Sequence, residues 1–446
     1  MNPTRKIAEF ITRYDWSDLS LEAVERAKGS FMDYVGVTLA GVHEESAAII
    51  RRLAEEMGGN PQATIWGSKF KTSVLLAALA NGTAAHALDL DDTSAVMMAH
   101  PSIQLLPALF ALGELKHATG QEIILGYIIG FEVGAGLGRA MNPDFVTQGW
   151  FPVGPLGTLM QTAACSKLLG LDTEQIENAL GIAANLAAGL RCNNGTMAKP
   201  LMAGSAASSA LLAVLSASDG LTANRKALED RFGFFENFSR ADTERLRQSI
   251  ERLGDPLEII HSGPAHKLYP CCAGTHAAID CALNIVRQHK PNPDDIKKIE
   301  VAISSGVKFL LIHPRPKTET EAKFSLEYCV ARAIMDGRIG PDQFTPEKIQ
   351  DPFLNAFIEK VSPKYLDRAS RAVEIKVLMK DGAVYSLKVE QPKGTPANPL
   401  SRSDLERKFR QCAGNILSEE RIKSVFDHLN HFERLEDVSD FIAGLA

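Results

Sequence analysis

Apolar side chains recur about every 3.6 positions over most of the first 265 residues, and this spacing predicts α-helices. Helices are expected over residues 20–40, 73–88, 121–141, 157–169, 173–190 and 203–218. Several of these segments are rich in alanine, glycine and serine, whose small side chains allow helix axes to approach closely. The pattern therefore predicts a tightly packed, multi-helix body.

The pattern changes after His266, where apolar and polar residues begin to alternate as they do in half-buried strands. Strands are expected at 299–303, 373–377 and 384–389, and helices at 275–288 and 324–336. Asp381-Gly382 is a preferred hairpin turn between the last two strands. Residues 266–398 are therefore predicted to form a smaller α/β domain, with an antiparallel sheet and helices on one face.

The tail from residue 399 returns to a helical pattern after a segment rich in proline and glycine. Ser403 and Glu406 stand at the spacing of a capping box, which marks a helix start. We expect residues 399–446 to pack on the helical body formed by residues 1–265. The fold class is then mainly α, a large all-helical domain with residues 266–398 inserted as an α/β lid.

Composition narrows the possible partners. The 446 residues are 45% hydrophobic and 23% charged, with a net charge of -6 and no basic run. These values are typical of a globular protein and give no reason to expect nucleic acid or a membrane as partner. The opening residues look like an amphipathic helix rather than a secretion signal, so we expect a cytoplasmic protein whose seven cysteines are free thiols.

One segment of the helical part is unusually polar. His86-Ala-Leu-Asp-Leu-Asp-Asp-Thr93, followed by His100-Pro-Ser102, places aspartates, histidines and hydroxyl groups among alanine and leucine. If the first stretch continues a helix, Asp89, Asp92 and Thr93 share one face at i, i+3 and i+4. Burying ionised groups without partners costs several kcal/mol, so such a cluster is typical of a binding or catalytic site. A helix cap or a buried salt bridge is the purely structural alternative.

Carboxylates at this spacing can also hold Mg²⁺. No second acidic cluster stands at ligand spacing elsewhere in the sequence, and no histidine–cysteine pattern indicates zinc. We therefore expect no metal.

Three more segments carry candidate residues. Lys199 follows a polar loop and stands directly before a proline, where a partly desolvated lysine can bind an anion or act as a base. Near the expected domain junction, Lys267 precedes Cys272, and a thiol beside a lysine can become a low-pKa acid or base. Tyr328 fits either the lid core or a cleft at that junction, a favoured place for ligands.

Together and in order, these segments resemble the MmgE/PrpD family. The matching stretches are ALDLDDT with a following HPS, GW-P-GPLGT at 149–158, GTMAKPL-AG at 195–204, K-YPCCAGTHAAID at 267–280 and AKFSLEY at 322–328. The resemblance implies a helical domain with an α/β lid, a homodimer, and an active site in the cleft between the domains. It also implies no organic cofactor and a small-molecule substrate that carries two or more carboxylates.

The resemblance also implies site residues by position. By this correspondence the catalytic candidates are Asp89, His100, Lys199, Lys267 and Tyr328, and Cys272 is added because of its place near Lys267. Thr93 is a candidate substrate-binding residue by the same correspondence, and Ser102, Asn194 and Thr196 are added from the same polar segments. This chain departs from the family pattern at Phe151 and Cys272, where relatives often have histidine, and at Met202.

Members of the family share one step, the removal of a proton from the carbon next to a carboxylate. Such a step needs a base, and cations or hydrogen-bond donors that hold the developing negative charge. We expect His100 to be the base, with Asp89 orienting it, and Lys199 and Lys267 to hold the carboxylates. Cys272 is compatible with the second acid/base group of an epimerase.

The predicted reaction is the epimerisation of iminodisuccinate. A dehydratase acting on 2-methylcitrate or citrate is the first alternative, and it needs an additional acid for the departing hydroxyl. The missing histidines make a decarboxylase a weaker match. A carboxylate-binding protein without catalysis is a further alternative, but it explains the buried polar set only as salt bridges.

Overall fold

The computed structural model describes residues 2–367 and 372–446, and the chain divides into two compact units. The helical unit comprises Met1–Ala87, Asp91–Pro264 and Ser401–Ala446. The mixed unit comprises Ala265–Leu400 together with Leu88–Leu90. The chain thus enters the mixed unit for three residues, Leu88–Leu90, long before its main passage through that unit.

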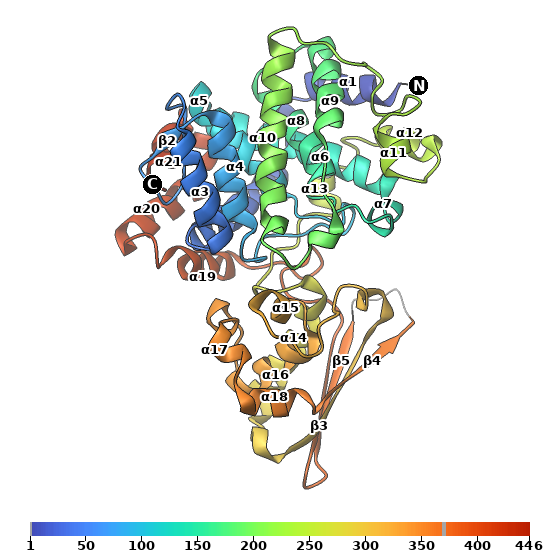
Figure 1. The fold of residues 1–446 in the computed structure, drawn as a ribbon, viewed down its shortest axis with the longest axis vertical. Coiled ribbons are helices and arrows are strands. Elements are labelled where there is room, and N and C mark those ends of the chain that lie inside the picture. The colour runs from blue at the N-terminus through green and yellow to red at the C-terminus, as the bar shows by residue number, and fades with distance from the viewer. Residues whose placement is uncertain (1, 368–371) are drawn as a thin grey trace. The chain divides into compact units, whose positions relative to one another are not determined.

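The helical unit is built from long helices with few strands (Figure 1). Its longer helices are α1 (Pro3–Arg13), α2 (Leu21–Gly41), α3 (Glu45–Met57), α4 (Val74–His86), α5 (Leu106–Lys116), α6 (Gly120–Met141), α8 (Pro155–Leu168), α9 (Thr173–Leu186) and α10 (Ala198–Ser218). The shorter elements are β1 (Ala63–Thr64), β2 (Lys71–Thr72), α7 (Asp144–Thr147), α11 (Phe234–Phe238), α12 (Thr243–Ile250) and α13 (Glu258–His261). The predicted helices are confirmed, although α4 ends at residue 86 rather than 88, and α9 at 186 rather than 190. The helix expected at 203–218 begins earlier, at 198.

Two glycines bring α4 and α10 into close contact. A Cβ on Gly204 would lie 2.0 Å from the carbonyl oxygen of Leu79, and one on Gly82 would lie 2.7 Å from Gly204 Cα. Only glycine fits such a crossing. His86 at the end of α4 and Lys199 at the start of α10 are each only about one turn from it, at 1.5 Å of rise per residue.

The tail contributes α19 (Arg402–Ala413), α20 (Glu419–Asn430) and α21 (Val438–Ala443) to the helical unit. A buried ion pair between Lys408 and Asp33 joins α19 to α2. The expected capping box at Ser403 and Glu406 is wrong. The box is formed by Ser401 and Asp404, because the helix begins two residues earlier.

The mixed unit holds a sheet of four strands in the order β4-β3-β5-β6. These strands are β3 (Ile296–Ser304), β4 (Val361–Leu366), β5 (Val373–Met379) and β6 (Val384–Val389), and the helices of the unit are α14 (Ala273–His289), α15 (Glu319–Lys323), α16 (Leu326–Asp336), α17 (Pro346–Ile349) and α18 (Pro352–Ile358). Buried positions alternate along β3 and β5, so one face of the sheet packs on the apolar core of this unit.

The expectation of a purely antiparallel sheet is wrong in one respect. β3 pairs antiparallel with β5, and β5 with β6, but β3 runs parallel to β4. The sequence of β4 shows no alternation of apolar and polar residues, so this strand was not predicted. It contains Pro363, and proline is confined to edge strands such as β4.

Two helices, α6 and α10, are long and apolar enough to cross a membrane by length and composition alone. The apolar part of α6 is almost wholly buried among other helices of the unit, and that of α10 more than half buried. Packing within the helical unit therefore accounts for the apolar character of α6 and for much of that of α10.

Candidate active site

The polar segment after α4 is not helical, contrary to the expectation from its spacing. The helix ends at His86, and Asp89 adopts a left-handed backbone with φ 53°. Because aspartate tolerates this conformation better than most residues, it can turn the chain there. Asp89, Asp92 and Thr93 consequently share no helix face, and the three aspartates 89, 91 and 92 have different partners.

Asp91 lies between two imidazoles. His86 Nδ1 is 3.0 Å from Asp91 Oδ1, and His100 Nδ1 is 2.8 Å from Asp91 Oδ2. The two rings contact each other edge to face, with centroids 4.6 Å apart. The carboxylate beside His100 Nδ1 is thus Asp91, a residue that was not among the expected site residues.

The electrostatics of this cluster follow from burial and from its opposite charges. Burial alone raises the pKa of Asp91, but the two imidazoles outweigh it and hold that pKa well below its usual range. The pKa of His86 is lowered to about 4, chiefly by burial and also by the charge of Lys199, although Asp91 acts in the opposite direction. His86 is therefore neutral near pH 7 and donates from Nδ1 to an ionised Asp91.

The two histidines differ in accessibility. The His86 side chain is fully buried, and its Nε2 has no hydrogen-bond partner among the described residues. The His100 side chain is 11% exposed. Of the two, His100 is thus the one that a small molecule can reach.

Asp92 faces away from this pair, toward a hydroxyl network. It accepts hydrogen bonds from the backbone N–H of Ser102 at 3.0 Å and from its hydroxyl at 2.6 Å. The Ser102 hydroxyl also lies 3.0 Å from the hydroxyl of Tyr127 on α6. All three side chains are buried, and the expected role of Ser102 in binding substrate stays a prediction.

Phe151 packs on the histidine pair. Its ring stacks on His86 at a centroid distance of 6.3 Å and meets His100 edge-on at 6.4 Å. Its backbone N–H donates to the carbonyl of Gly189 at 3.1 Å. A Cβ on the nearby Gly154 would collide with the carbonyl oxygen of Ala188, so these two segments lie unusually close.

Lys199 completes the cluster from the first turn of α10. Its side chain is buried, and its ammonium group lies 5.7 Å from the centroid of the Phe151 ring. The N-terminus of a helix carries a partial positive charge, which repels a cation and attracts an anion. The buried Lys199 adds its own positive charge in the same place, so the two together favour a bound anion.

The other candidates of the helical unit lie beside these groups in the sequence. Thr93 is half-buried, directly before the Ser94–Ala99 bridge. Asn194 Oδ1 is buried without a hydrogen-bond partner among the described residues. Thr196 is exposed, and its hydroxyl accepts from the N–H of Ala198 at 3.3 Å, which helps to start α10.

In the mixed unit, Lys267 is paired with Asp89. Its ammonium lies 3.1 Å from Asp89 Oδ2 and donates to the backbone carbonyl of Asp89 at 2.7 Å. Both side chains are almost fully buried. This pair uses both the side chain and the left-handed backbone of Asp89.

Cys272 lies at the N-terminus of α14, and its N–H donates to the carbonyl of Lys323 at 2.9 Å. Burial raises the pKa of its thiol to about 11, and the negative charge of Asp89 adds to this rise. Lys267 opposes the shift without reversing it. The expected low-pKa thiol is therefore wrong, and Cys272 is a protonated group near pH 7.

Tyr328 lies in the core of the mixed unit. Its hydroxyl donates to the carbonyl of Gln343, and its ring contacts Phe344. Burial raises the pKa of this hydroxyl to about 12. The structure thus places Tyr328 as a core residue, and its role toward a substrate stays a prediction.

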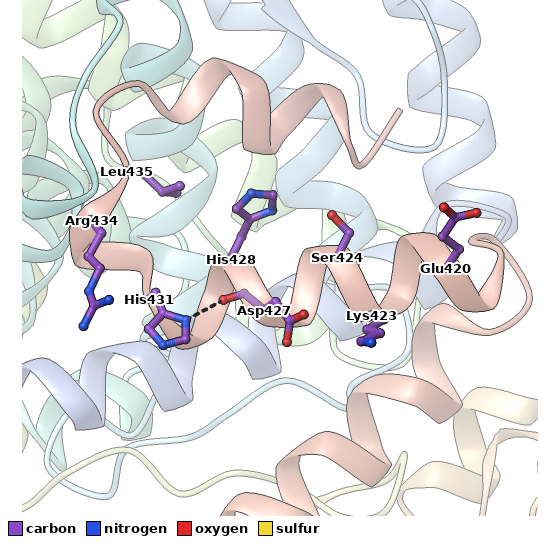
Figure 2. A pocket seen from close by; sticks show the side chains of 8 residues that line it. All are labelled: Glu420, Lys423, Ser424, Asp427, His428, His431, Arg434 and Leu435. Carbon is purple, nitrogen blue, oxygen red and sulfur yellow. Dashed lines mark hydrogen bonds between the residues drawn. The ribbon is translucent and has the colours of Figure 1, made fainter.

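A separate surface pocket lies along α20 (Figure 2). It is lined by Glu420, Lys423, Ser424, Asp427, His428, His431, Arg434 and Leu435. His431 contacts the backbone carbonyl of Asp427 at 3.2 Å. None of the predicted site residues lines this pocket.

The histidine cluster also has the ligand types of a metal site. In the described part of the chain, His86, Asp91 and His100 offer ligand atoms within 4.8 Å of one another. His86 Nδ1 already forms a hydrogen bond with the Asp91 carboxylate, and His100 Nδ1 lies 2.8 Å from it, so a cation would have to displace these contacts. That no metal is required stays a prediction.

Comparison with known families covers most of the chain. Residues 5–246 match the model of the MmgE/PrpD N-terminal domain, and residues 269–431 match that of the MmgE/PrpD C-terminal domain. This chain belongs to the MmgE/PrpD family. The resemblance found in the sequence motifs is thereby confirmed.

Several curated members of the MmgE/PrpD family are similar along nearly their whole length. Cis-aconitate decarboxylase of Mus musculus is 30% identical over 442 residues, covering 93% of this chain and 88% of that protein. Cis-aconitate decarboxylase of Homo sapiens is 30% identical over 440 residues, with coverage of 94% and 90%. A cis-aconitate decarboxylase of Aspergillus terreus is 26% identical over 467 residues, with coverage of 98% and 95%.

Two residues of the cluster, Asp91 and His86, were not among the site residues expected from the sequence. Both stand in the polar segment, but the assumed helix gave precedence to residues three and four apart. If the chain after His86 is extended or turns, Asp91 can lie as close to His100 as Asp89 or Asp92 can. The left-handed backbone of Asp89 turns the chain, and a single sequence does not show this conformation.

Proposed function

We propose that this protein catalyses proton transfer at the carbon next to a carboxylate of a polycarboxylate substrate, without an organic cofactor. The observation that carries the proposal is the His86–Asp91–His100 cluster with Lys199 beside it. It combines an accessible imidazole, an ionised carboxylate that orients it and a buried cation. General-base removal of a weakly acidic proton requires this combination.

His100 is the proposed base. Asp91 orients its ring through Nδ1 and stabilises the imidazolium that forms when the proton arrives, as carboxylates do in histidine-based catalysis. Lys199 and the N-terminus of α10 hold a substrate carboxylate and the charge that develops on it. Phe151 excludes water from the imidazoles and so strengthens these interactions.

Roles in the mixed unit are proposed from its own chemistry. Lys267, paired with Asp89, is a second candidate cation for a substrate carboxylate. Cys272 carries its proton near pH 7, so it is proposed as a donor rather than a base. Thr93, Asn194 and Thr196 are kept as candidate hydrogen-bonding residues for the substrate.

Within this chemistry, we propose epimerisation of iminodisuccinate. An epimerase breaks a C–H bond on one face of the carbon and forms one on the other, so it needs a base and a proton donor but no acid for a leaving group. The chain offers His100 as a candidate base and Cys272, which carries its proton near pH 7, as a candidate donor. Phe151 cannot donate a proton, so the histidine cluster gains no acid from the position where relatives often carry histidine.

A lyase reaction is the second candidate. The similar curated proteins are named as cis-aconitate decarboxylases, and this supports decarboxylation of a tricarboxylate or the related dehydration of 2-methylcitrate or citrate. Dehydration uses the same base and cations. Decarboxylation uses the same cations, but it needs a proton donor for the carbanion that remains when CO₂ leaves. A carboxylate-binding protein without catalysis would bind these acids and exchange no proton.

The test is incubation of the protein with single polycarboxylates in D₂O. Epimerisation predicts deuterium at the α-carbon of one iminodisuccinate isomer and appearance of the other isomer, with no alkene. Release of CO₂ from cis-aconitate, or an alkene from citrate or 2-methylcitrate, would instead establish the lyase. Failure to exchange or convert any of these acids would refute the proposed proton transfer.

A further inference from the structure

We propose that Asp92 and Ser102 are positioning residues that hold His100 in its place beside Asp91. This inference rests on the proposed function only in naming His100 as the base. Neither side chain contacts the imidazole, so both act through the backbone on either side of it.

The Asp92–Ser102 pair fixes the chain two residues after His100. Both oxygens of Asp92 are occupied, one by the backbone N–H of Ser102 and one by its hydroxyl. Tyr127 holds the same hydroxyl from α6 at 3.0 Å. The turn at His100-Pro101-Ser102 is thereby attached to the rigid interior of the helical unit.

The chain before His100 is fixed independently. Ser94 and Ala99 exchange backbone hydrogen bonds of 2.9 and 3.3 Å, which close the loop between them. The N–H of His100 itself donates to Gln104 Oε1 at 2.9 Å. With Ser102, this gives three attachment points at residues 99, 100 and 102.

Gln104 also connects His100 to the segment of Phe151. Its amide nitrogen donates to the carbonyl of Pro152 at 3.0 Å. The side chain of one glutamine therefore joins the backbone that carries the imidazole to the backbone that carries the ring packed on it. Displacement of either segment is transmitted to the other.

Burial of Asp92 costs stability, which favours a role beyond packing. The side chain is fully buried, and no basic group is among the contacts found for it in the described chain. Its pKa is raised to about 8, chiefly by burial and also by the carboxylates of Asp33 on α2 and of Asp91. An apolar residue of similar size would avoid this cost, but it would leave the Ser102 N–H unsatisfied.

The first experiment compares Ser102→Ala with Ser166→Ala. Ser166 is a matched control because it is a fully buried serine of α8 whose hydroxyl has no partner among the described residues. We expect Ser102→Ala to lower kcat at least about tenfold with little change in KM, since small displacements of a catalytic group can cost up to about 100-fold. Ser166→Ala should keep the kcat of the wild type.

The deciding readout is the imidazole of His100, observed by NMR in protein labelled with [¹³C]histidine. Its signal is assigned among the 11 histidines by its loss in His100→Gln. In Ser102→Ala the signal should shift, and in Ser166→Ala it should not. An unchanged signal in Ser102→Ala overturns the proposal.

Two further variants keep the test decisive. Asp92→Asn retains an oxygen for the Ser102 N–H and a donor for its hydroxyl, so the His100 signal should stay near its wild-type position. If Ser102→Ala fails to fold, Tyr127→Phe removes only the Tyr127 hydroxyl that contacts the Ser102 hydroxyl, and it should shift the His100 signal by a smaller amount. No movement in Tyr127→Phe would then overturn the proposal.

Failure of the proposed function gives a different result. His100→Gln with full activity would refute the role of His100 as the base, whatever the NMR signal does. A shifted His100 signal in Ser102→Ala would still establish the positioning contacts.

Discussion

Asp91 and Asp92 are neighbours in the chain, both fully buried, and burial alone raises the pKa of both carboxyls. The pKa of Asp91 nevertheless lies well below its usual range, because two imidazoles face it. The pKa of Asp92 lies near 8, because hydroxyl and N–H donors only partly offset burial and the nearby carboxylates. One position along the backbone thus separates an ionised group from one that is largely protonated at pH 7.

The carboxylate of Asp91 should matter strongly for turnover. Asp91→Asn removes the negative charge between the two imidazoles, so we expect kcat to fall by about 100-fold or more. Steady-state assays against the substrate found in the D₂O experiment provide the measurement. Asp437→Asn is the matched control, because Asp437 also lies 2.8 Å from a histidine Nδ1, that of His117, but in an exposed pair. Equal loss in both variants would contradict the role of Asp91.

Lys199 should act mainly on binding of the carboxylate. Lys199→Met removes the charge but keeps most of the buried stem, so we expect KM to rise at least about tenfold, the loss of one charge-assisted contact. Initial rates over a range of substrate concentrations separate KM from kcat. Lys6→Met, at an exposed position on α1, is the control. Wild-type kinetics for Lys199→Met would remove the lysine from the site.

Single residues were predictable where their chemistry was unusual for their surroundings. His100 and Lys199 stood out as polar groups in apolar helical sequence, and the structure brings both together with His86. Asp91 was not distinguishable from Asp89 by residue type. Only the backbone turn at Asp89, which depends on tertiary contacts, assigns one to a histidine pair and the other to Lys267.

At the scale of elements, the crossing of α4 and α10 positions the cluster. Apolar periodicity predicted both helices, because their buried faces repeat every 3.6 residues. It did not predict where α4 stops, since alanine and leucine continue past His86. Nor did it predict β4, whose Pro363 and partly exposed residues give no alternation.

The crossing itself can be tested with a single methyl group. Gly204→Ala would place a Cβ against the carbonyl oxygen of Leu79, so the helices must separate. We expect a loss of about 1–3 kcal/mol in the free energy of unfolding, the range for overpacking a core. Urea unfolding provides the measurement, and Ser205→Ala, on an exposed position of the same helix, is the control. An unchanged urea midpoint for Gly204→Ala would show that α4 and α10 leave space for a methyl group at this position.

At the scale of the whole molecule, the fold class was predictable and is confirmed as mainly α with a smaller α/β part. All three tryptophans, at positions 16, 66 and 150, belong to the helical unit. Tryptophan fluorescence therefore follows the unfolding of that unit alone. The entry of Leu88–Leu90 into the mixed unit was not predictable, since no change of composition marks it.

The stability of the helical unit should fall as pH rises from 6.5 to 8.5. Burial raises the pKa of Glu132 and of Asp92 to about 8, so each folded carboxyl keeps its proton there while the unfolded one is already ionised. Stability from such groups is present at low pH and is lost as pH rises through the folded pKa, on the order of 1–2 kcal/mol per group. Below pH 6.5, the lowered pKa of His86 acts in the opposite direction, so the alkaline side is diagnostic.

Glu132→Gln should reduce this loss. Glutamine keeps an oxygen for the N–H groups of Glu258 and Ile259, which Glu132 Oε1 accepts at 2.5 and 3.3 Å, but it does not ionise. Urea titrations followed by tryptophan fluorescence at pH 6.5 and 8.5 give the slope of the free energy of unfolding against pH. Glu251→Gln, at an exposed position, should keep the wild-type slope. If Glu132→Gln also keeps the wild-type slope, the buried carboxyl of Glu132 does not cause the loss of stability at high pH.

Because Leu88–Leu90 belong to the mixed unit, this unit cannot be produced complete from one continuous segment of the chain. A gene fragment for residues 265–400 encodes most of the unit, but it omits Asp89. Lys267 would lose the carboxylate and the carbonyl that it contacts here, and removing one partner of a buried pair costs about 3–5 kcal/mol. Anyone who wishes to graft this module onto another scaffold must carry a tripeptide from elsewhere in the chain along with it.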